Sequence, residues 1–489
     1  MALDPVRKIA RYASCACDVR LHIHAFMEVE ALSQSRKHRS KDMKANELPK
    51  QLQHVNLDAA GIDIGSGSHF VAVPDGRDRV DVREFGPFTT DLQEMADWLR
   101  RCGVTTVAME STSVYWIPVF EFLERAGFEV SLVDARRVRN VSGRKSDVLD
   151  CQWLQQLHTY GLLAGAFRPP DEVCVLRGYM RQREMLVQSS VMHIQHMQKA
   201  LQQMNLLLHN VVTDITGTTG MKVIKSIIAG ERDPHVLAEH RDYRCRSSAA
   251  TIAKSLVGNY REEHLFALKQ SLELYEMYRD KIEECELAIA RYLGEQPNRI
   301  EDEPPTEQNE KRVRVRDRIR GGVDMRSQLF KLYGVDLFTV PGLGADTLLT
   351  LAGEVGFDVR AWRTEKHFTS WLSLCPGTKK SGGKVLSSKT RKNANRAATA
   401  FRIAAAAVTK SKTALGAFYR RVKARAGAPK AIVATARKLA VMFYSMLKNG
   451  TSYVEVGQAA YEEKFRQRRL GGMQRQALEM GFQLIPITE

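Results

Sequence analysis

Between residues 59 and 133 the chain alternates short apolar segments with amphipathic ones, and this order restricts the fold more than any other sequence feature. Three apolar segments come first, separated by turn-forming residues, and two more then alternate with segments of helical periodicity. A strand meander followed by alternating helices and strands is typical of an α/β domain with a mixed sheet. The expected strands are 59–65, 69–73, 79–85, 104–109 and 129–133, and the expected helices are 90–101 and 114–126.

Two long helices are predicted in the middle of the chain. The stretch Leu176–Asn210 is rich in Met, Gln and Leu and contains no proline, which favours a helix. In residues 261–293 apolar side chains recur at alternating three- and four-residue steps, as in a coiled coil. This seam fits either a packing face within the chain or a dimer interface. Its members are Leu265, Leu268, Leu272, Tyr275, Ile282, Ile289 and Leu293.

Changes in composition divide the chain into six segments. Residues 1–55 are polar and basic, and residues 295–324 contain few apolar side chains, so neither is expected to form a core. The predicted segments are a basic extension at 1–55, the α/β domain at 56–170, a helical region at 171–294, a polar linker or insertion at 295–324, a mostly α-helical domain at 325–450 and a tail at 451–489.

The formal net charge of +17 is concentrated in one part of the chain. Residues 376–470 carry 22 Lys and Arg but three acids, and such a balance favours a polyanionic partner, above all nucleic acid. No apolar run approaches the roughly 18–20 residues that cross a bilayer, so we expect no membrane partner. The eight cysteines show no zinc-ribbon spacing, and reduced thiols are expected.

Four acids near the N-terminus suggest a metal site. Asp63 interrupts an apolar strand, and Glu110 follows the last residue of another; a buried carboxylate needs a cation or hydrogen-bond donors. Asp147 and Asp150 are three residues apart and share one face if that segment is helical. Mg²⁺ prefers oxygen ligands of this kind. Each acid taken alone has another explanation: Glu110 as a helix cap, and the two aspartates as partners of nearby basic residues.

The order of these acids on a strand meander resembles the RuvC-like members of the ribonuclease H fold. The phrases Gly61–Gly65, Ala108–Thr112 and Lys145–Asp150 are similar to the DEDD transposases of the insertion-sequence one-ten family, the bridge-RNA-guided recombinases. Further blocks resemble the family's middle region and its C-terminal serine domain. These blocks are 213–220, 338–342, 374–377 and 381–384, and the likeness covers roughly residues 57–450.

The resemblance implies a set of functional residues and partners. It makes Asp63, Glu110, Asp147 and Asp150 the ligands of Mg²⁺ or Mn²⁺, and it makes Ser381 the nucleophile that bonds to DNA. It also implies a guide RNA, a homo-oligomer (dimer or tetramer) and a bacterial cytoplasmic protein that joins the nucleoid when bound to DNA. The chain departs from the family at Cys151, which follows the last aspartate where an alanine is usual, and in the segments 1–55 and 295–324, which are additional.

From the residues alone, Ser381 lies in a loop rich in Gly and Lys that suits a phosphate, but no neighbouring His or carboxylate offers a base, and Ser387 and Ser388 are rivals. The surrounding basic residues are expected to bind nucleic acid, and the alternative is a solvated face. They are Lys379, Lys380, Lys384, Lys389, Arg391, Lys392 and Arg396. The turn containing Gly342 and Gly344 is similar to a helix-hairpin-helix element, or is an ordinary helix-linking turn.

Three functions are compatible with these features. The first is a DNA transposase or recombinase that cuts and rejoins DNA through the acids and Ser381. The second is a RuvC-like, structure-specific DNA nuclease that uses water as its nucleophile. The third is a nucleic-acid-binding regulator with a decayed catalytic domain, and the presence of all four acids counts against it.

Overall fold

The computed structural model describes residues 56–111, 113–133, 147–163, 165–304, 319–391 and 395–485. The chain divides into two compact units, Met1–Arg168 and Pro169–Glu489, and each is described by itself. The further division of the second unit into smaller segments remains a prediction. None of the described helices is long and apolar enough to cross a membrane.

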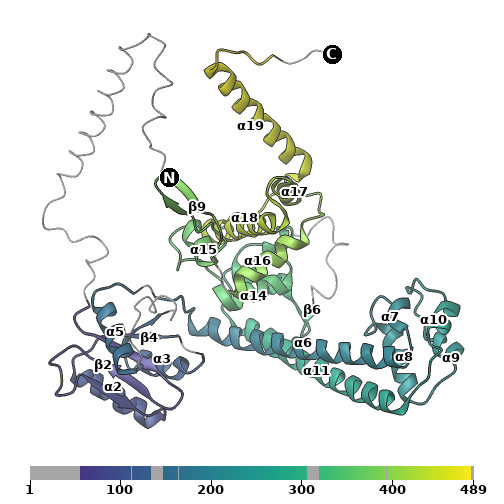
Figure 1. The fold of residues 1–489 in the computed structure, drawn as a ribbon, viewed down its shortest axis with the longest axis horizontal. Helices are drawn as coiled ribbons and strands as arrows, with labels where there is room; N and C mark the ends of the chain where they lie inside the picture. The colour runs from purple at the N-terminus through teal and green to yellow at the C-terminus, as the bar shows by residue number, and fades with distance from the viewer. Residues whose placement is uncertain are drawn as a thin grey trace, which may run out of the picture. The chain divides into compact units, whose positions relative to one another are not determined.

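The N-terminal unit is built on one five-stranded sheet, as Figure 1 shows. Its strands lie in the order β3-β2-β1-β4-β5. The first three form an antiparallel meander, and β4 and β5 run parallel to β1. The predicted mixed sheet of an RNase H-like domain is therefore confirmed. The strands are β1 (Ala59–Ile64), β2 (His69–Ala72), β3 (Val82–Phe85), β4 (Thr106–Glu110) and β5 (Glu129–Val133).

Helices cover both faces of this sheet. On one face, α2 (Thr89–Arg101) and α3 (Trp116–Arg125) enclose the larger core, to which β1 contributes Ile62 and Ile64. On the other face lies α5 (Asp147–Thr159), with Ala108, Val133 and Leu154 buried beneath it. Because successive strand residues point to opposite faces, the residues between the core positions of β1 face α5.

Two contacts fix α5 against the sheet. A Cβ atom built on Gly61 would lie 2.3 Å from the backbone nitrogen of Gln155 and 2.4 Å from the carbonyl oxygen of Cys151, so only glycine allows this approach. At the far end of the helix, Thr106 Oγ1 and His158 Nε2 are 2.9 Å apart and buried. Thr106 also donates to the carbonyl of Glu129, so the imidazole donates to the threonine oxygen.

The C-terminal unit begins with a long helical hairpin. In it, α6 (Asp171–Gln203) packs along α11 (Glu262–Glu295), and the Tyr292 hydroxyl donates to the carbonyl of Glu172. The end of α11 thus lies beside the start of α6, and the pair is antiparallel. Most of the predicted α11 seam is buried against α6 and its neighbours, so it packs within the chain. The buried members are Leu268, Leu272, Tyr275, Ile289 and Leu293.

Four short helices close the far end of this hairpin around a core of their own (Figure 1). The block at residues 213–220 forms the turn into the second of them, where Gly217 is the N-cap. They are α7 (Leu208–Val211), α8 (Thr218–Ile228), α9 (Pro234–Glu239) and α10 (Ala249–Ser255).

The remaining residues of this unit are mostly helical, as predicted. Their core contains the packed aromatic rings of Trp362, Phe368, Phe401 and Phe443. The helices are α13 (Met325–Tyr333), the short 3-10 turn η3 (Leu337–Thr339), α14 (Ala345–Val355), α15 (Glu365–Trp371), α16 (Arg396–Ala407), α17 (Ala414–Ala426), α18 (Ala428–Asn449) and α19 (Gly457–Glu479). Two hairpins accompany them: β6 (Ile319–Arg320) with β7 (Val323–Asp324), and β8 (Lys379–Ser381) with β9 (Lys384–Ser387).

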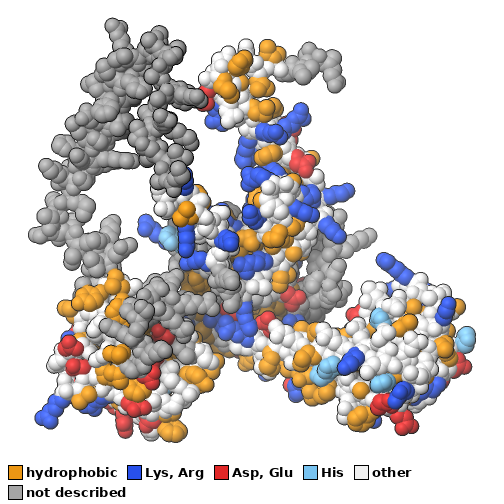
Figure 2. Space-filling model, in the orientation of Figure 1, with side chains coloured by type: hydrophobic (Ala, Val, Ile, Leu, Met, Phe, Trp, Pro, Cys, Tyr) orange, Lys and Arg blue, Asp and Glu red, His pale blue; other side chains and the backbone are white. Residues whose placement is uncertain are grey.

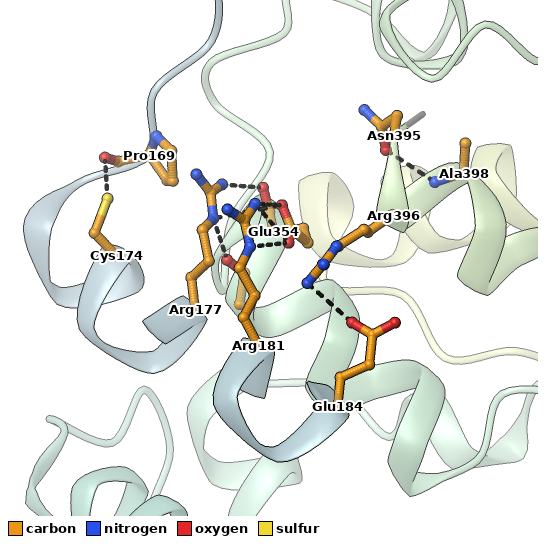
Figure 3. A network of polar contacts seen from close by, with 10 residues as sticks. Pro169, Cys174, Arg177, Arg181, Glu184, Glu354, Asn395, Arg396 and Ala398 are labelled. Atoms are coloured by element: carbon orange, nitrogen blue, oxygen red, sulfur yellow. Dashed lines mark hydrogen bonds and ion pairs between the residues drawn. The ribbon is translucent and has the colours of Figure 1, made fainter. Parts of the chain in front are cut away.

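A network of arginines joins the hairpin to the C-terminal helices (Figure 3). Arg177 donates to the carbonyls of Gly353 and Glu354 on α14, at 2.9 and 3.0 Å. Arg181 donates to both carboxylate oxygens of Glu354, at 3.1 and 3.2 Å. Bidentate arginine pairs of this kind fix orientation as well as distance. The start of α6 is therefore held in one register on α14.

We predict that Gly61→Ala displaces α5 from β1, because the added methyl group would meet backbone atoms that cannot rotate away. The expected loss is about 2–3 kcal/mol of local stability, the upper part of the range for overpacking. Hydrogen exchange of the full chain measures it as faster exchange of the amides of β1 and α5. Gly67→Ala is the matched control, because its Cβ would meet nothing within 4 Å. Equal exchange in the two variants would contradict the prediction.

Candidate active site

Asp63 and Glu110 lie next to each other at the same edge of the sheet. In the parallel pairing of β1 with β4, Ile62 stands opposite Met109, so the next residue of each strand is Asp63 and Glu110. Asp63 and Glu110 each stand two residues after Gly61 and Ala108, so their side chains lie on the same face of the sheet as these residues. This is the face that α5 covers. The sequence placed Asp63 inside an apolar strand and Glu110 at the end of another, and the parallel pairing of β1 with β4 brings the two acids side by side.

Asp147 and Asp150 occupy the first turn of α5. The helix runs back along β1 from this turn to Thr159, whose carbonyl accepts from the backbone N–H of Asn56 at 2.8 Å. Its N-terminus is thus at the Asp63 end of the strand. Carboxylates are stabilised in such a first turn by the helix dipole. Both side chains are exposed.

The charges of these acids act on one another. Burial, and then the negative charges of Asp147 and Asp150, raise the pKa of Asp63 from 3.8 to about 6. Desolvation and neighbouring negative charge both disfavour the ionised form of a carboxyl group. Asp63, Asp147 and Asp150 therefore form one electrostatic cluster, with Glu110 beside it on the sheet.

The donor chemistry of this cluster suits a hard divalent cation, because every predicted ligand is a carboxylate. A bound cation would offset the repulsion between Asp63 and the charges of Asp147 and Asp150. In the described residues, however, no three His, Cys, Asp or Glu side chains lie close enough to hold one ion. The fit to a metal therefore rests on donor type and charge.

Cys151 lies directly beneath the acids and is buried. Its Sγ donates to the carbonyl of Val148 at 3.1 Å. Burial, followed by the charge of Asp63, raises the pKa of this thiol to about 12. The thiol therefore stays protonated and neutral.

Sequence reasoning missed the residues that position this cluster. His158 fixes the far end of α5 but is separated from the acids in sequence, and no motif marks it. Burial lowers the pKa of His158, which keeps its imidazole neutral in the bond with Thr106. Gly61 belongs to the Gly61–Gly65 phrase, and its position inside an apolar strand was the one available signal of a close backbone approach.

Ser381 is the last residue of an exposed strand. It pairs with Lys384 across a two-residue turn formed by Gly382 and Gly383, whose φ angles are 53° and 78°. Left-handed values at both positions are typical of the tight turns that favour glycine. The segment predicted as a loop is therefore a hairpin with Ser381 at its tip. In the part of the chain that the structure describes, no His or carboxylate is hydrogen-bonded to Ser381.

The rival serines lie on the same hairpin. The Ser387 hydroxyl accepts a hydrogen bond from the backbone N–H of Lys389 at 3.3 Å. Ser388 is exposed and follows the end of β9. Neither lies at the glycine turn, where backbone atoms are least covered.

The basic residues near Ser381 fall into two groups. The first comprises exposed lysines that form no ion pair with any described carboxylate: Lys379, Lys380, Lys384 and Lys389. The second is engaged within the unit. Arg391 donates to the carbonyl and hydroxyl of Ser370 at 2.9 and 3.2 Å, and Arg396 pairs with Glu184 of α6 at 2.9 Å (Figure 3). Lys392 lies outside the described residues.

The two glycines of the expected helix-hairpin-helix turn have different surroundings. A Cβ on Gly342 would lie 2.6 Å from the carbonyl oxygen of Ala404, and its φ is +93°. This glycine therefore packs against α16. Gly344 is the N-cap of α14, and nothing lies within 4 Å of its Cβ position. Of the two, Gly344 has the open surroundings that a phosphate contact requires.

An RNase H-like sheet with carboxylates at the carboxyl ends of β1 and β4 defines a class of enzymes that act on nucleic acid. Comparison with family models narrows this class. Residues 60–206 match the DEDD model of the IS110 type, described as "Transposase", and residues 336–420 match the model described as "Transposase IS116/IS110/IS902 family". The chain belongs to the IS110 family of transposases. A search of curated proteins gave no match.

The two matches cover parts of both units, and they confirm the predicted transposase. Enzymes of this class cut and join DNA, so DNA is a partner of the chain. The first match begins within β1 and ends just beyond α6, and the second runs from before η3 into α17. The helix α19 lies beyond both matches.

We predict that Asp63→Asn stabilises the metal-free protein. Because the folded pKa is about 6 against an ordinary 3.8, stability is lost as the pH rises through this window. An asparagine does not titrate, so the variant should be about 1–2 kcal/mol more stable at neutral pH, after allowance for solvent screening. Thermal unfolding in EDTA at pH 4 to 8 measures the difference.

Added Mg²⁺ should then raise the unfolding midpoint of the wild type more than that of the variant. The control is Asp75→Asn, because Asp75 is exposed in a turn. If Asp63→Asn lowers the midpoint in EDTA at neutral pH, the assignment of a strained carboxylate cluster is wrong.

Proposed function

We propose that this transposase cuts and rejoins DNA by the joint action of the carboxylate cluster and Ser381. The observation that carries the proposal is the placement of four acids at one end of the sheet: Asp63 and Glu110 lie on neighbouring strands, and Asp147 and Asp150 lie in the first turn of α5 at the Asp63 end of β1. The exposed glycine-tipped hairpin supplies the second element. The resemblance to the DEDD recombinases supports both assignments.

The acids would hold Mg²⁺ or Mn²⁺. Such a cation, when bound, offsets the charge that develops on the phosphate during displacement. The chain's own contribution is the placement of the carboxylates: β1 and β4 carry Asp63 and Glu110, and α5 carries Asp147 and Asp150 at the Asp63 end of β1. The half-buried position of Asp63 limits competition from water for the same oxygens.

Ser381 would act as the nucleophile. Its hydroxyl oxygen forms a bond to phosphorus and gives its proton to solvent. The phosphodiester bond to one strand end breaks, and that end takes a proton from solvent and leaves as an alcohol. The reverse attack by a strand-end hydroxyl releases the serine and rejoins DNA. The phosphoserine ester conserves the bond energy, so no nucleotide cofactor is needed.

The hairpin suits this role for two physical reasons. Gly382 and Gly383 have no side chains, so the backbone N–H groups at the tip can approach a phosphate closely. The exposed lysines on both strands add positive charge without acidic neighbours. We include Lys379, Lys380, Lys384, Lys389 and Gly344 among the DNA contacts of this proposal.

Two further parts of the proposal rest on the family resemblance. They are a guide RNA that supplies base recognition and a homo-oligomer that completes the active site. Both would operate in the bacterial cytoplasm.

Ser381→Ala should abolish the covalent protein–DNA intermediate and lower strand joining by at least about 100-fold, as expected for removal of a nucleophile. The measurement is a denaturing gel with end-labelled element DNA, in which the adduct migrates with the protein. Ser388→Ala is the matched control and should form the adduct normally.

The alternative function, a RuvC-like nuclease that uses water, makes the opposite prediction. Under it, Ser381→Ala would retain wild-type cleavage, and no adduct would form in either protein. Wild-type joining by the Ser381→Ala variant would therefore overturn the serine assignment and leave the carboxylate assignment intact.

If the acids and the serine that act on one phosphodiester come from different subunits, two inactive variants should complement each other. We expect that Asp63→Asn and Ser381→Ala are each inactive alone and recover about a quarter of wild-type joining when co-expressed. The double variant mixed with wild type is the control for dominance. Complete inactivity of the mixture, with subunit exchange shown by tagged chains, would indicate that each subunit uses its own acids and serine.

A further inference from the structure

A cluster of cations and aromatic rings joins α17, α18 and α19. The guanidinium of Arg421 lies 4.1 Å from the ring centre of Phe465, 5.2 Å from that of Tyr461 and 5.5 Å from that of Phe418. The ammonium of Lys438 lies 4.9 Å from the Phe418 ring and 5.3 Å from the Tyr461 ring. Two cations thus share two of the same rings.

These contacts hold α19 in place. The helix has no buried residue of its own, and it projects from α17 and α18 in Figure 1. Cation–π contacts are attractive, because the face of an aromatic ring carries negative charge density. Arg420 adds a hydrogen bond to the side chain of Gln458 at 2.8 Å. The base of α19 is therefore anchored, while the rest of its surface stays accessible.

Packing alone does not account for the charges of this cluster. Burial, and then the positive charges of Arg421 and Arg468, lower the pKa of Lys438. In the described part of the chain, neither of the two arginines nor Lys438 forms an ion pair with a carboxylate. A single cation would serve the aromatic packing, and adding like charges beside it costs free energy. An anion from outside the chain would offset that cost.

The nearby acids are engaged elsewhere. Glu462 accepts from Gln458 at 2.7 Å, and Glu463 accepts from Gln467 at 3.1 Å. Glu455 accepts from the Tyr453 hydroxyl at 2.7 Å. The hydrogen bonds of these acids thus go to neutral donors, and none of the acids, all within the described residues, forms an ion pair with Arg421, Lys438 or Arg468.

The cationic surface extends along α19 from this cluster. At about 100° per residue, Arg468 and Arg469 lie within about 60° of the docked Phe465 around the helix, and both are exposed. Figure 2 shows Lys and Arg side chains gathered where α19 leaves α17. We call Arg421, Lys438, Arg468 and Arg469 the α19 basic surface.

We propose that the α19 basic surface binds the phosphate backbone of duplex DNA, as a contact separate from the Ser381 hairpin. The uncompensated cations favour a polyanion, and DNA is the polyanion on which a transposase acts. The 23 residues of α19 span about 34 Å, close to one turn of duplex. Backbone contacts of this kind position DNA without reading its sequence.

This surface deepens the proposed function without depending on its chemistry. It requires that DNA is the substrate, but it requires neither the serine nor the metal. It also lies outside both family matches, apart from the start of α17. Binding can therefore be tested in a protein that cannot cleave.

The test uses the full chain carrying Ser381→Ala, in EDTA, with a fluorescent 40-base-pair duplex of arbitrary sequence. Anisotropy titrations from 50 to 300 mM salt compare that protein with the same protein carrying Arg468→Gln and Arg469→Gln. Loss of two phosphate contacts should lower the slope of log affinity against log salt by about 2 and weaken binding roughly 10- to 50-fold near 0.1 M salt. Arg421 is left intact so that α19 remains docked.

The charge-conserving variant Arg468→Lys with Arg469→Lys is the matched control, and it should keep the wild-type salt slope. Unfolding midpoints should agree among the three proteins. An unchanged slope in the Gln variant overturns the proposal. So does a loss confined to RNA of the same length, which would assign the surface to RNA, or a change in oligomeric mass with DNA binding unchanged, which would assign it to a second copy of the chain.

Discussion

The close approach of α5 to β1 at Gly61 is the contact on which the candidate active site depends. The backbone of α5 occupies the space that the side chain of any other residue at position 61 would fill. This contact places the first turn of α5 near the end of β1. The far end of the helix is fixed by the buried bond between His158 and Thr106 and by the cap that Asn56 provides. The positions of the acids are therefore set by these contacts of α5, although the acids repel one another. Apolar packing of the sheet against its helices offsets that repulsion, as is common where function requires strain.

In the C-terminal unit, polar contacts perform the corresponding task. Arg177 and Arg181 hold Glu354 from α6, and Glu184 of the same helix holds Arg396 at the start of α16. Asn395 caps α16 by accepting from the N–H of Ala398, so the segment that leaves the serine hairpin ends in two fixed residues. The helical hairpin thus supports both α14 and the start of α16. Arg396, which the sequence suggested as a DNA contact, has a partner within the unit and contributes to this support.

The parts of the fold that follow from local periodicity could be predicted from the sequence. Between residues 59 and 133 short apolar segments alternate with amphipathic ones in an order that few other folds explain. Asp63 stood out because it interrupts one of these strands, and Glu110 because it ends another. Contacts between distant residues left no such signal, which is why the roles of Gly61 and His158 emerged only from the structure. The seam of α11 has the same periodicity whether its partner is α6 or a second chain. The β8–β9 hairpin and α19 were missed for a common reason: both are exposed, so neither shows the apolar pattern by which strands and helices are recognised.

The two units carry charge of opposite sign at the places where they are proposed to act. Carboxylates gather at the end of β1 in one, and lysines and arginines gather on the serine hairpin and the α19 basic surface in the other. In both cases packing rather than attraction brings like charges together. A phosphodiester with its divalent cation carries charges that complement both surfaces. The cation complements the acids, and the phosphates complement the basic side chains. Salt screens the exposed cations more strongly than the half-buried Asp63, so rising ionic strength should release DNA before it weakens the interaction of the acids with their cation.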